Sequence, residues 1–164
     1  MQSPVPLGGG RVAGSGERLT RMIFSFGQSE QERIEVDVQH YERAPVGEYY
    51  DDNWLTTQVR VRAGGFRGNV DAAILTVELV AFVARLRQLH NTLHGAADFS
   101  TLEEQLHLRV TGDGKGHMEL VGDVADQPGI GNRLHFRLQF DQSQLEESIR
   151  ELERVTSAFP VRAA

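Results

Sequence analysis

The sequence predicts an α+β fold: a largely antiparallel sheet of about six strands with two amphipathic helices packed on one face. Several segments alternate apolar and polar residues, as half-buried strands do, and two others repeat apolar residues every three or four positions, as helices do. The order is strands, helix, strands, helix, and the links between neighbouring strands are short. Such links favour hairpins over parallel crossovers, because parallel strands need a long connection.

The first group of strands shows the clearest alternation. Residues 34–40 place apolar side chains on one face and polar side chains on the other. Residues 55–63 and 66–74 alternate in the same way and are separated only by Gly64 and Gly65, which readily adopt the positive φ of a tight turn. Residues 55–74 are therefore predicted to form a β-hairpin.

The period then changes to that of a helix over residues 76–93. Its apolar stripe consists of Leu79, Phe82, Val83, Leu86, Leu89 and Leu93. Thr76 is the predicted N-cap, with Glu78 favourable in the first turn, and Gly95 is predicted to stop the helix in a left-handed conformation.

Three more predicted strands and a second helix complete the chain. The strands cover residues 106–110, 118–124 and 134–140, and glycine-rich turns join them. The helix covers residues 141–159, where Ser143 and Glu146 have capping-box spacing, and Pro160 ends it. Three strands and a helix thus occur twice, which hints at a duplicated unit, although the residues at matching places are not similar enough to establish a repeat.

Length and composition indicate one domain preceded by a leader. Residues 1–21 are rich in glycine and have no apolar period, so we expect a disordered leader, with residues 22–164 forming a single domain and Met22 as an alternative start. No stretch has the roughly 18 consecutive apolar residues of a membrane span, and the leader lacks the apolar core of a secretory signal. The absence of cysteine fits a reducing compartment, so a cytoplasmic location is expected.

The charge is unevenly distributed along the chain. Residues 1–21 carry +2, so residues 22–164 carry −8 to reach the total of −6, and Lys115 is the only lysine. This excess disfavours nucleic acid as a partner and favours a basic protein through electrostatic steering. Net acidity also serves solubility, which is the alternative explanation.

The motifs that usually carry catalysis or metal binding are absent from the sequence. His90 and His94 have the four-residue spacing of metal ligands, but no third ligand follows nearby, and a helix C-terminus favours histidine anyway. The segment Gly112–Gly116 lacks the ending of a phosphate-binding loop, and no Gly-x-Ser-x-Gly elbow occurs. We therefore predict no catalytic residues, no metal and no cofactor.

Residues 47–54 (GEYYDDNW) concentrate aromatic and acidic side chains where a short turn would join two strands. Tyrosine, tryptophan and flanking carboxylates are typical of contacts with a cationic protein surface. The candidate partner-binding residues are Glu48, Tyr49, Tyr50, Asp51, Asp52 and Trp54. Alternatively, Asp51 and Asp52 only turn the chain, and Trp54 begins the next strand and fills the core.

A family resemblance rests on this segment and four others. Residues 40–55 (HYERAPVGEYYDDNWL), 63–66, 76–79, 102–105 and 112–117 resemble WapI-like immunity proteins of bacteria, over about residues 24–161. The resemblance implies a non-enzymatic protein that binds and neutralises a polymorphic toxin domain, often a nuclease, inside the producing cell. It supplies no catalytic residues.

Two other classes of function stay open at the level of sequence. The first is an enzyme or small-ligand-binding domain whose pocket forms on the sheet around His107, His117 and His135. The second is a structural or assembly module. The sequence pattern predicts no particular oligomeric state.

Overall fold

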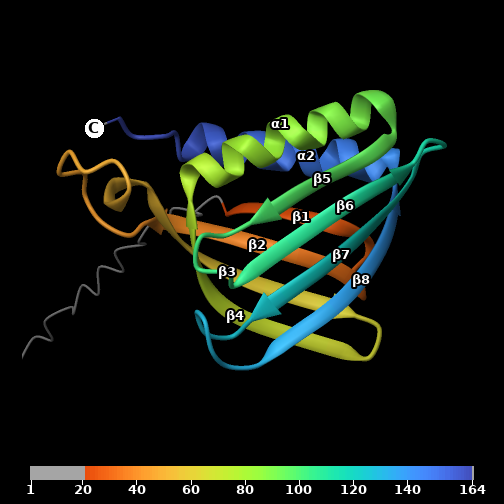
Figure 1. Ribbon diagram of the computed structural model, residues 1–164, viewed down its shortest axis with the longest axis horizontal. Coiled ribbons are helices and arrows are strands. Elements are labelled where there is room, and N and C mark those ends of the chain that lie inside the picture. Colours follow the sequence, from red (N-terminus) through yellow and green to blue (C-terminus); the bar gives the residue numbers. More distant parts are fainter. Residues whose placement is uncertain (1–20, 164) are drawn as a thin grey trace, which may run out of the picture.

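The computed structural model describes residues 21–163 (Figure 1). In this part of the chain two four-stranded antiparallel sheets have the strand orders β1-β2-β3-β4 and β5-β6-β7-β8. The elements are β1 (Met22–Ser29), β2 (Glu32–Tyr41), η1 (Asp51–Asn53), β3 (Trp54–Ala63), β4 (Phe66–Leu75), α1 (Thr76–Thr92), β5 (His94–Ser100), β6 (Leu106–Asp113), β7 (His117–Ala125), β8 (Arg133–Asp141) and α2 (Gln142–Ala158). Each sheet is a simple meander and is followed by a helix.

The α+β class, the antiparallel pairing and the two helices are confirmed, but the single sheet of about six strands is corrected to two sheets of four. The additional strands are β1 and β5. In β5 only Ala97 and Phe99 are buried hydrophobic residues, and the strand begins directly after a helix, so its alternation is too short to recognise. The hint of duplication gains support, since four strands and a helix occur twice.

The helices lie side by side on one side of the molecule (Figure 1). Helix α1 packs against β5 and α2 against β1, which are the first strands of the two sheets. Arg85 of α1 donates to the backbone carbonyl of Asp98, and Ser148 of α2 donates to that of Ser25. The helices thereby satisfy backbone groups at sheet edges that would otherwise be open.

The two sheets share one core. The ring centroid of Phe82 lies 5.8 Å from that of Phe26 in the first sheet and 5.0 Å from that of Phe99 in the second. Gly122 on β7 makes room for Phe136, because a Cβ atom at this glycine would lie 2.4 Å from the ring. The two halves therefore contribute buried side chains to one hydrophobic cluster.

Both ends of α1 differ from the prediction. Thr76 is the first helical residue and Leu75 is the N-cap, whose N–H donates to the Glu78 carboxylate at 2.9 Å. At the other end Leu93 takes the left-handed conformation (φ 59°), and Gly95 lies inside β5. The chain turns earlier than predicted because β5 must begin at His94 to pair with β6.

The cap of α2 is also corrected. The Asp141 carboxylate accepts from the N–H groups of Ser143 and Gln144, and the Gln144 side chain accepts from the Asp141 N–H. The predicted pair Ser143 and Glu146 is shifted from this capping box by two residues. The helix ends at Ala158, two residues before Pro160.

The predicted disordered leader lies outside the described residues, apart from Arg21. The Arg21 guanidinium donates to the Asp37 carboxylate at 2.7 Å. Within residues 21–163, no helix combines the length and apolar character needed to cross a membrane.

Candidate functional site

The connection between β2 and β3 is a twelve-residue loop, residues 42–53, here called the β2–β3 loop. The N–H of Glu42 donates to the carbonyl of Trp54 at 2.9 Å, which closes its base. A short 3-10 helix forms near its end, where the N–H of Asp52 donates to the carbonyl of Glu48. The loop is thus a compact Ω-type loop with its own internal structure.

Asp52 organises the first part of this loop. Its buried carboxylate accepts from the backbone N–H groups of Val46, Gly47 and Glu48 at 2.8–3.1 Å and from the guanidinium of Arg43 at 3.3 Å. Burial alone would raise the pKa of this carboxyl group, but these donors outweigh it and lower the pKa of Asp52 below its ordinary value. The ionised carboxylate therefore holds residues 46–48 in place.

Asn53 joins the loop to two distant parts of the chain. Its side-chain amide donates to the carbonyls of Tyr49 and Arg162, and its side-chain oxygen accepts from the Thr76 hydroxyl and the Arg162 N–H. These four bonds satisfy both donors and two acceptor positions of the amide. The β2–β3 loop, the start of α1 and the C-terminal segment thus meet at one buried side chain.

Arg162 completes this connection. Its guanidinium stacks on the Tyr41 ring at 3.4 Å and donates to the carbonyl of Arg43 at 2.9 Å. The Tyr41 hydroxyl donates to the carbonyl of Pro160, and Phe159 packs edge-on against the Tyr41 ring. The segment after α2 is therefore fastened along the base of the loop.

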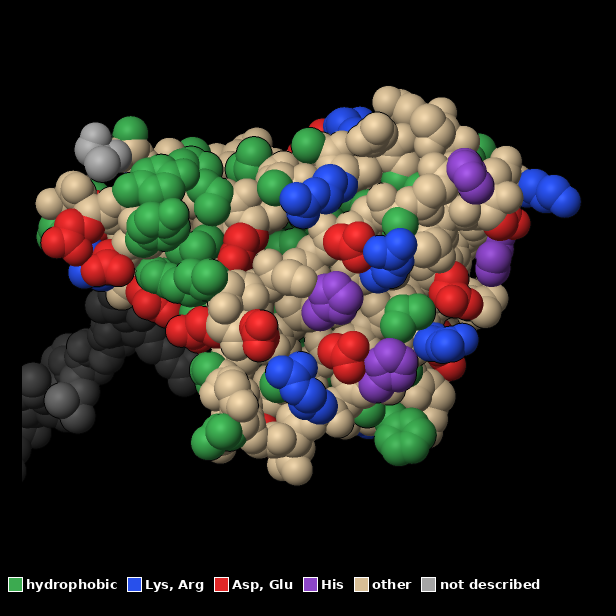
Figure 2. Space-filling model, viewed as in Figure 1, with side chains coloured by type: hydrophobic (Ala, Val, Ile, Leu, Met, Phe, Trp, Pro, Cys, Tyr) green, Lys and Arg blue, Asp and Glu red, His purple; other side chains and the backbone are tan. Residues whose placement is uncertain are grey.

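The outer surface of the loop is apolar and aromatic. Val46 is 68% exposed, Tyr50 64% and Tyr49 39%, and the two tyrosine rings pack perpendicular to each other at 5.5 Å. Figure 2 shows a patch of hydrophobic side chains over this end of the molecule, with acidic side chains along one border. A rigid apolar surface with a charged border has the composition of a protein-binding surface.

The structure separates the six candidate residues. Glu48, Tyr49, Tyr50 and Asp51 lie on the surface, whereas the Asp52 side chain is only 2% exposed. Direct contact between Asp52 and a partner is therefore excluded in this conformation. Trp54 begins β3, as one alternative predicted, but it stays half-buried outside the fully buried core.

Arg43 moderates the negative charge of the loop. Its guanidinium lies 3.2 Å from a carboxylate oxygen of Glu48 and 3.4 Å from one of Asp51, in addition to its contact with Asp52. The side chains of Glu48 and Asp51 remain 66% and 54% exposed. A cationic partner would compete with Arg43 for them, so they suit steering better than tight anchoring.

The alternative pocket around three histidines does not form. His107 and His135 lie on the outer face of the second sheet on either side of Asp123, and His135 contacts its carboxylate at 3.2 Å. His117 pairs with Asp141 instead, six residues along β7, which corresponds to about 20 Å. The register therefore separates His117 from the other two.

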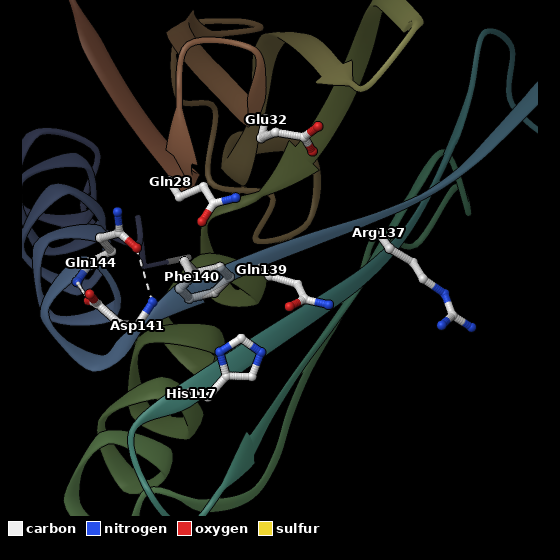
Figure 3. A pocket seen from close by; sticks show the side chains of 8 residues that line it. All are labelled: Gln28, Glu32, His117, Arg137, Gln139, Phe140, Asp141 and Gln144. Carbon is white, nitrogen blue, oxygen red and sulfur yellow. Dashed lines mark hydrogen bonds between the residues drawn. The ribbon is translucent and has the colours of Figure 1, made fainter.

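His117 lines a different hollow, of about 600 Å³, between the β1–β2 turn and the start of α2. Figure 3 shows His117 and Gln139 on neighbouring strands beside this space, with Gln28 opposite. The Asp141 and Gln144 side chains at its rim already form the α2 cap. The rest of the lining combines the amides of Gln28 and Gln139 with the side chains of Glu32, Arg137 and His117, so the hollow carries charges of both signs.

His90 and His94 are the pair whose spacing in the sequence was that of metal ligands. The two residues do not share a helix face, because α1 ends at Thr92 and His94 begins β5. Among residues 21–163, no group of three or more His, Asp or Glu side chains is arranged to hold a metal ion.

Three residues of the site were missed by sequence reasoning. Val46 was not recognised as part of the patch, and Asn53 and Arg162 were not recognised as its supports. Val46 gives only a weak signal in the sequence: it is an apolar residue, directly after Pro45, in a loop that is otherwise polar. Asn53 and Arg162 are 109 residues apart, so no local pattern marks their contact.

A family model, that of the WapI-like immunity proteins, matches residues 23–160. The match includes the β2–β3 loop and nearly all of both sheets and both helices, and it ends two residues before Arg162. The resemblance expected from the sequence is therefore confirmed. Comparison with curated proteins finds no match.

Proposed function

This chain belongs to the WapI-like immunity protein family, and from this premise we propose that it binds a bacterial toxin domain and neutralises it without catalysing a reaction. The protein acts in the cytoplasm of the cell that makes the toxin. Binding blocks the toxin's active surface, so the function requires a stable scaffold and a complementary surface. The family assignment supports this class of function, and the β2–β3 loop supports its location on the molecule.

The preformed β2–β3 loop is the observation that carries the proposal. Asp52 and Asn53 fix its backbone from inside, so Tyr49 and Tyr50 are presented on an already ordered surface. Pre-organisation lowers the ordering cost of association. Tyrosines with one exposed edge are frequent binding anchors, because they bury a large area with few rotatable bonds.

The expected partner has an apolar contact surrounded by basic residues. Glu48 and Asp51 lie beside the tyrosines with most of their side chains in solvent, and residues 22–164 carry net negative charge. The nucleic-acid-binding face of a nuclease is basic, because affinity for phosphates comes from Lys and Arg. We therefore propose a nuclease-like toxin domain as the partner.

The function is tested by identifying a toxin domain and measuring protection. The chain is used to capture its partner from lysate of the source cells, and the captured domain is then expressed under an inducible promoter. Co-expression of this chain should restore growth, and the purified chain should inhibit the toxin in vitro at a one-to-one ratio. A captured domain that stays fully toxic in the presence of an excess of this chain would contradict an immunity function.

The site is tested by kinetics with a matched pair of variants. Tyr50→Ala should raise the dissociation rate about 30-fold, which corresponds to about 2 kcal/mol for a desolvated anchor. Phe66→Ala is the control, because Phe66, the first residue of β4, is about as exposed (68%) as Tyr50. Asp51→Asn should mainly slow association and weaken its salt dependence.

The two parts of the proposal can fail separately. If Tyr50→Ala and Phe66→Ala both bind like the wild type, the β2–β3 loop lies outside the interface although the protein still neutralises the toxin. If Phe66→Ala alone weakens binding, the interface lies at the opposite end of the first sheet. Circular dichroism of each variant verifies that it is folded.

A further inference from the structure

Strand β8 is an outer strand of the second sheet, and it pairs with β7 on one side only. The N–H of Gln142 donates to the carbonyl of Gly116, one position beyond this ladder, and hydrogen-bonded pairs alternate with open pairs in an antiparallel ladder. His135 and Arg137 belong to open pairs, so they direct their N–H and C=O groups away from β7. Among the hydrogen bonds of residues 21–163, none involves these outward groups.

The other three outer strands have partners for outward backbone groups. In β1 and β5 the two helices supply them. In β4 the Gln105 side chain donates to the outward carbonyl of Asp71 at 3.0 Å. Gln105 comes from the five-residue connection between β5 and β6, whereas the equivalent connection between β1 and β2 consists of residues 30 and 31 only. The short β1–β2 connection therefore leaves β8 without the cover that β4 has.

Two hollows lie along this edge of β8 and share Glu32 and Arg137 in their lining. The smaller, of about 330 Å³, is lined by four consecutive residues of β8, 134–137, and by Phe66 from the first sheet. Consecutive residues of a strand point to opposite faces, so a hollow that touches all four lies at the edge of the strand. The larger, of about 600 Å³, continues to Gln139 and separates β8 from the β1–β2 turn (Figure 3). The edge of β8 therefore borders a groove.

The outer face of β8 beside this groove is basic. Arg133, His135 and Arg137 are exposed and share that face. His135 contacts the Asp123 carboxylate at 3.2 Å, and Arg133 donates to the backbone carbonyl of Glu104 at 3.2 Å. Within residues 21–163, no carboxylate lies within ion-pair distance of Arg133 or Arg137. Two positive charges without an acidic partner thus lie four residues apart along the edge.

From this edge we propose that β8 binds an extended acidic segment of a partner protein, which pairs antiparallel with residues 133–139 as an added strand. Two acidic residues four positions apart in that segment lie opposite Arg133 and Arg137, on the same face. The residues next to them point to the other face, where the exposed Phe66 and the half-buried Leu134 offer an apolar contact. Main-chain hydrogen bonds supply affinity, and the side-chain contacts supply specificity.

The charges favour this partner over two others. A second copy of the chain, paired antiparallel about Arg137 or about His135, places arginine opposite arginine, and like charges on adjacent strands repel. The β2–β3 loop, at the opposite end of the first sheet, has an acidic border, so the basic partner proposed for it does not suit this groove (Figures 1 and 2). The inference therefore stands independently of toxin binding.

The binding is tested with a synthetic probe, the capped peptide acetyl-Thr-Val-Asp-Val-Thr-Val-Asp-amide. The peptide is titrated into the isotope-labelled full chain up to about 1 mM and followed by nuclear magnetic resonance. The amide signals of residues 133–139 should shift, and hydrogen exchange should slow at the N–H groups of His135 and Arg137. The same peptide with lysine in place of both aspartates should bind about tenfold more weakly or worse.

Two N-methylated peptides separate strand pairing from charge attraction. Methylation of both aspartate nitrogens removes N–H groups that face β8, so binding should weaken about tenfold or more. Methylation of the first two valine nitrogens removes N–H groups that face away, so affinity should stay within about threefold.

A charge reversal and a matched control test the site on the protein. Arg137→Glu should weaken binding of the aspartate peptide about tenfold or more and strengthen binding of the lysine peptide. Arg154→Glu reverses an exposed charge on α2 and should change neither affinity.

Any of three results overturns the proposal. The first is an absence of shifts in residues 133–139 up to about 1 mM peptide. The second is equal affinity of the two methylated peptides, which would leave charge attraction without strand pairing. The third is slow hydrogen exchange at His135 and Arg137 without peptide that becomes fast on dilution, because the edge would then pair with a second copy of the chain.

Discussion

The two halves of the molecule have the same order of elements and differ most in the connection between their middle strands. Residues 22–92 and residues 94–158 each form four antiparallel strands followed by a seventeen-residue helix. Strands β6 and β7 are joined by three residues, 114–116, whereas β2 and β3 are joined by the twelve residues of the β2–β3 loop. The second half shows that this strand pair needs only a tight turn.

An aspartate organises both connections, with different results. Asp113 accepts from the N–H groups of Lys115 and His117, and these bonds lower its pKa. Asp52 accepts three N–H groups in the same way, but the segment that it holds also carries Tyr49 and Tyr50. The extra residues of the first half therefore build a surface rather than a turn, which is why we place the partner-binding site there.

The largest expected effect tests whether the halves form one cooperative unit. Phe82 lies between the sheets and contacts the rings of Phe26 and Phe99, so Phe82→Ala should lower the free energy of unfolding by about 3–5 kcal/mol. Urea unfolding should show a single transition, with the same midpoint whether it is monitored by circular dichroism or by the fluorescence of Trp54. Val80→Ala, at an exposed position of α1, is the control and should cost under about 1 kcal/mol. Two separate transitions would mean that the halves unfold independently.

A smaller effect tests the support of the β2–β3 loop. Asn53→Ala removes four hydrogen bonds and leaves the buried Thr76 hydroxyl without its acceptor, so we expect a loss of about 2–3 kcal/mol. Hydrogen exchange should accelerate in residues 46–53 and at Arg162, but not in residues 114–116. Asn91→Ala, at an exposed position of α1, is the matched control. Equal losses in the two variants would show that the contacts of Asn53 do not stabilise the loop.

The pH dependence of stability should differ between the wild type and an Asp52→Asn variant. The pKa of Asp52 is lowered by folding, so its ionised form adds stability above the ordinary carboxyl pKa of about 4, and this stability is lost as the pH falls through the folded pKa. The variant should therefore be less stable than the wild type at pH 7, and the difference should shrink below about pH 4. Thermal unfolding of both proteins at a series of pH values measures this difference in stability. A difference that is constant with pH would show that the charge of Asp52 contributes nothing.

The smallest effect concerns two left-handed residues that are not glycine. Glu104, in the β5–β6 connection, is exposed and has φ 57°. Glu104→Gly should relieve backbone strain of about 1–2 kcal/mol. About half of this gain is offset, because glycine has more conformational freedom in the unfolded chain. The melting temperature should rise by about 1–3 °C. Leu93→Gly should give no such gain, because Leu93 packs against the core. A fall in the melting temperature of the Glu104 variant would contradict the strain argument.

Local periodicity was sufficient to predict six of the strands and both helices. The alternation in residues 34–40 and 55–74 depends only on which side chains face the core, so it is visible in a single segment. The same argument does not reveal which sheet a strand joins. Periodicity also missed β5, whose two buried residues are too few to show a period. The left-handed residue after α1 was predicted at Gly95 rather than Leu93, because a left-handed glycine is far commoner than a left-handed leucine.

The sequence by itself determined the class of elements, the acidic charge, the family and the position of the aromatic segment between two strands, because each of these is written in residues close together along the chain. Only the tertiary structure decided what each side chain of that segment does. Asp51 and Asp52 are identical neighbours, yet one is exposed and the other is buried beneath three backbone N–H groups. The Asn53 side chain accepts from Thr76 and from Arg162, and Arg162, which follows α2, reaches it only when both halves have folded. Hydrogen bonds and burial depend on distance in space, and for these residues that distance is set by the packing of the whole chain.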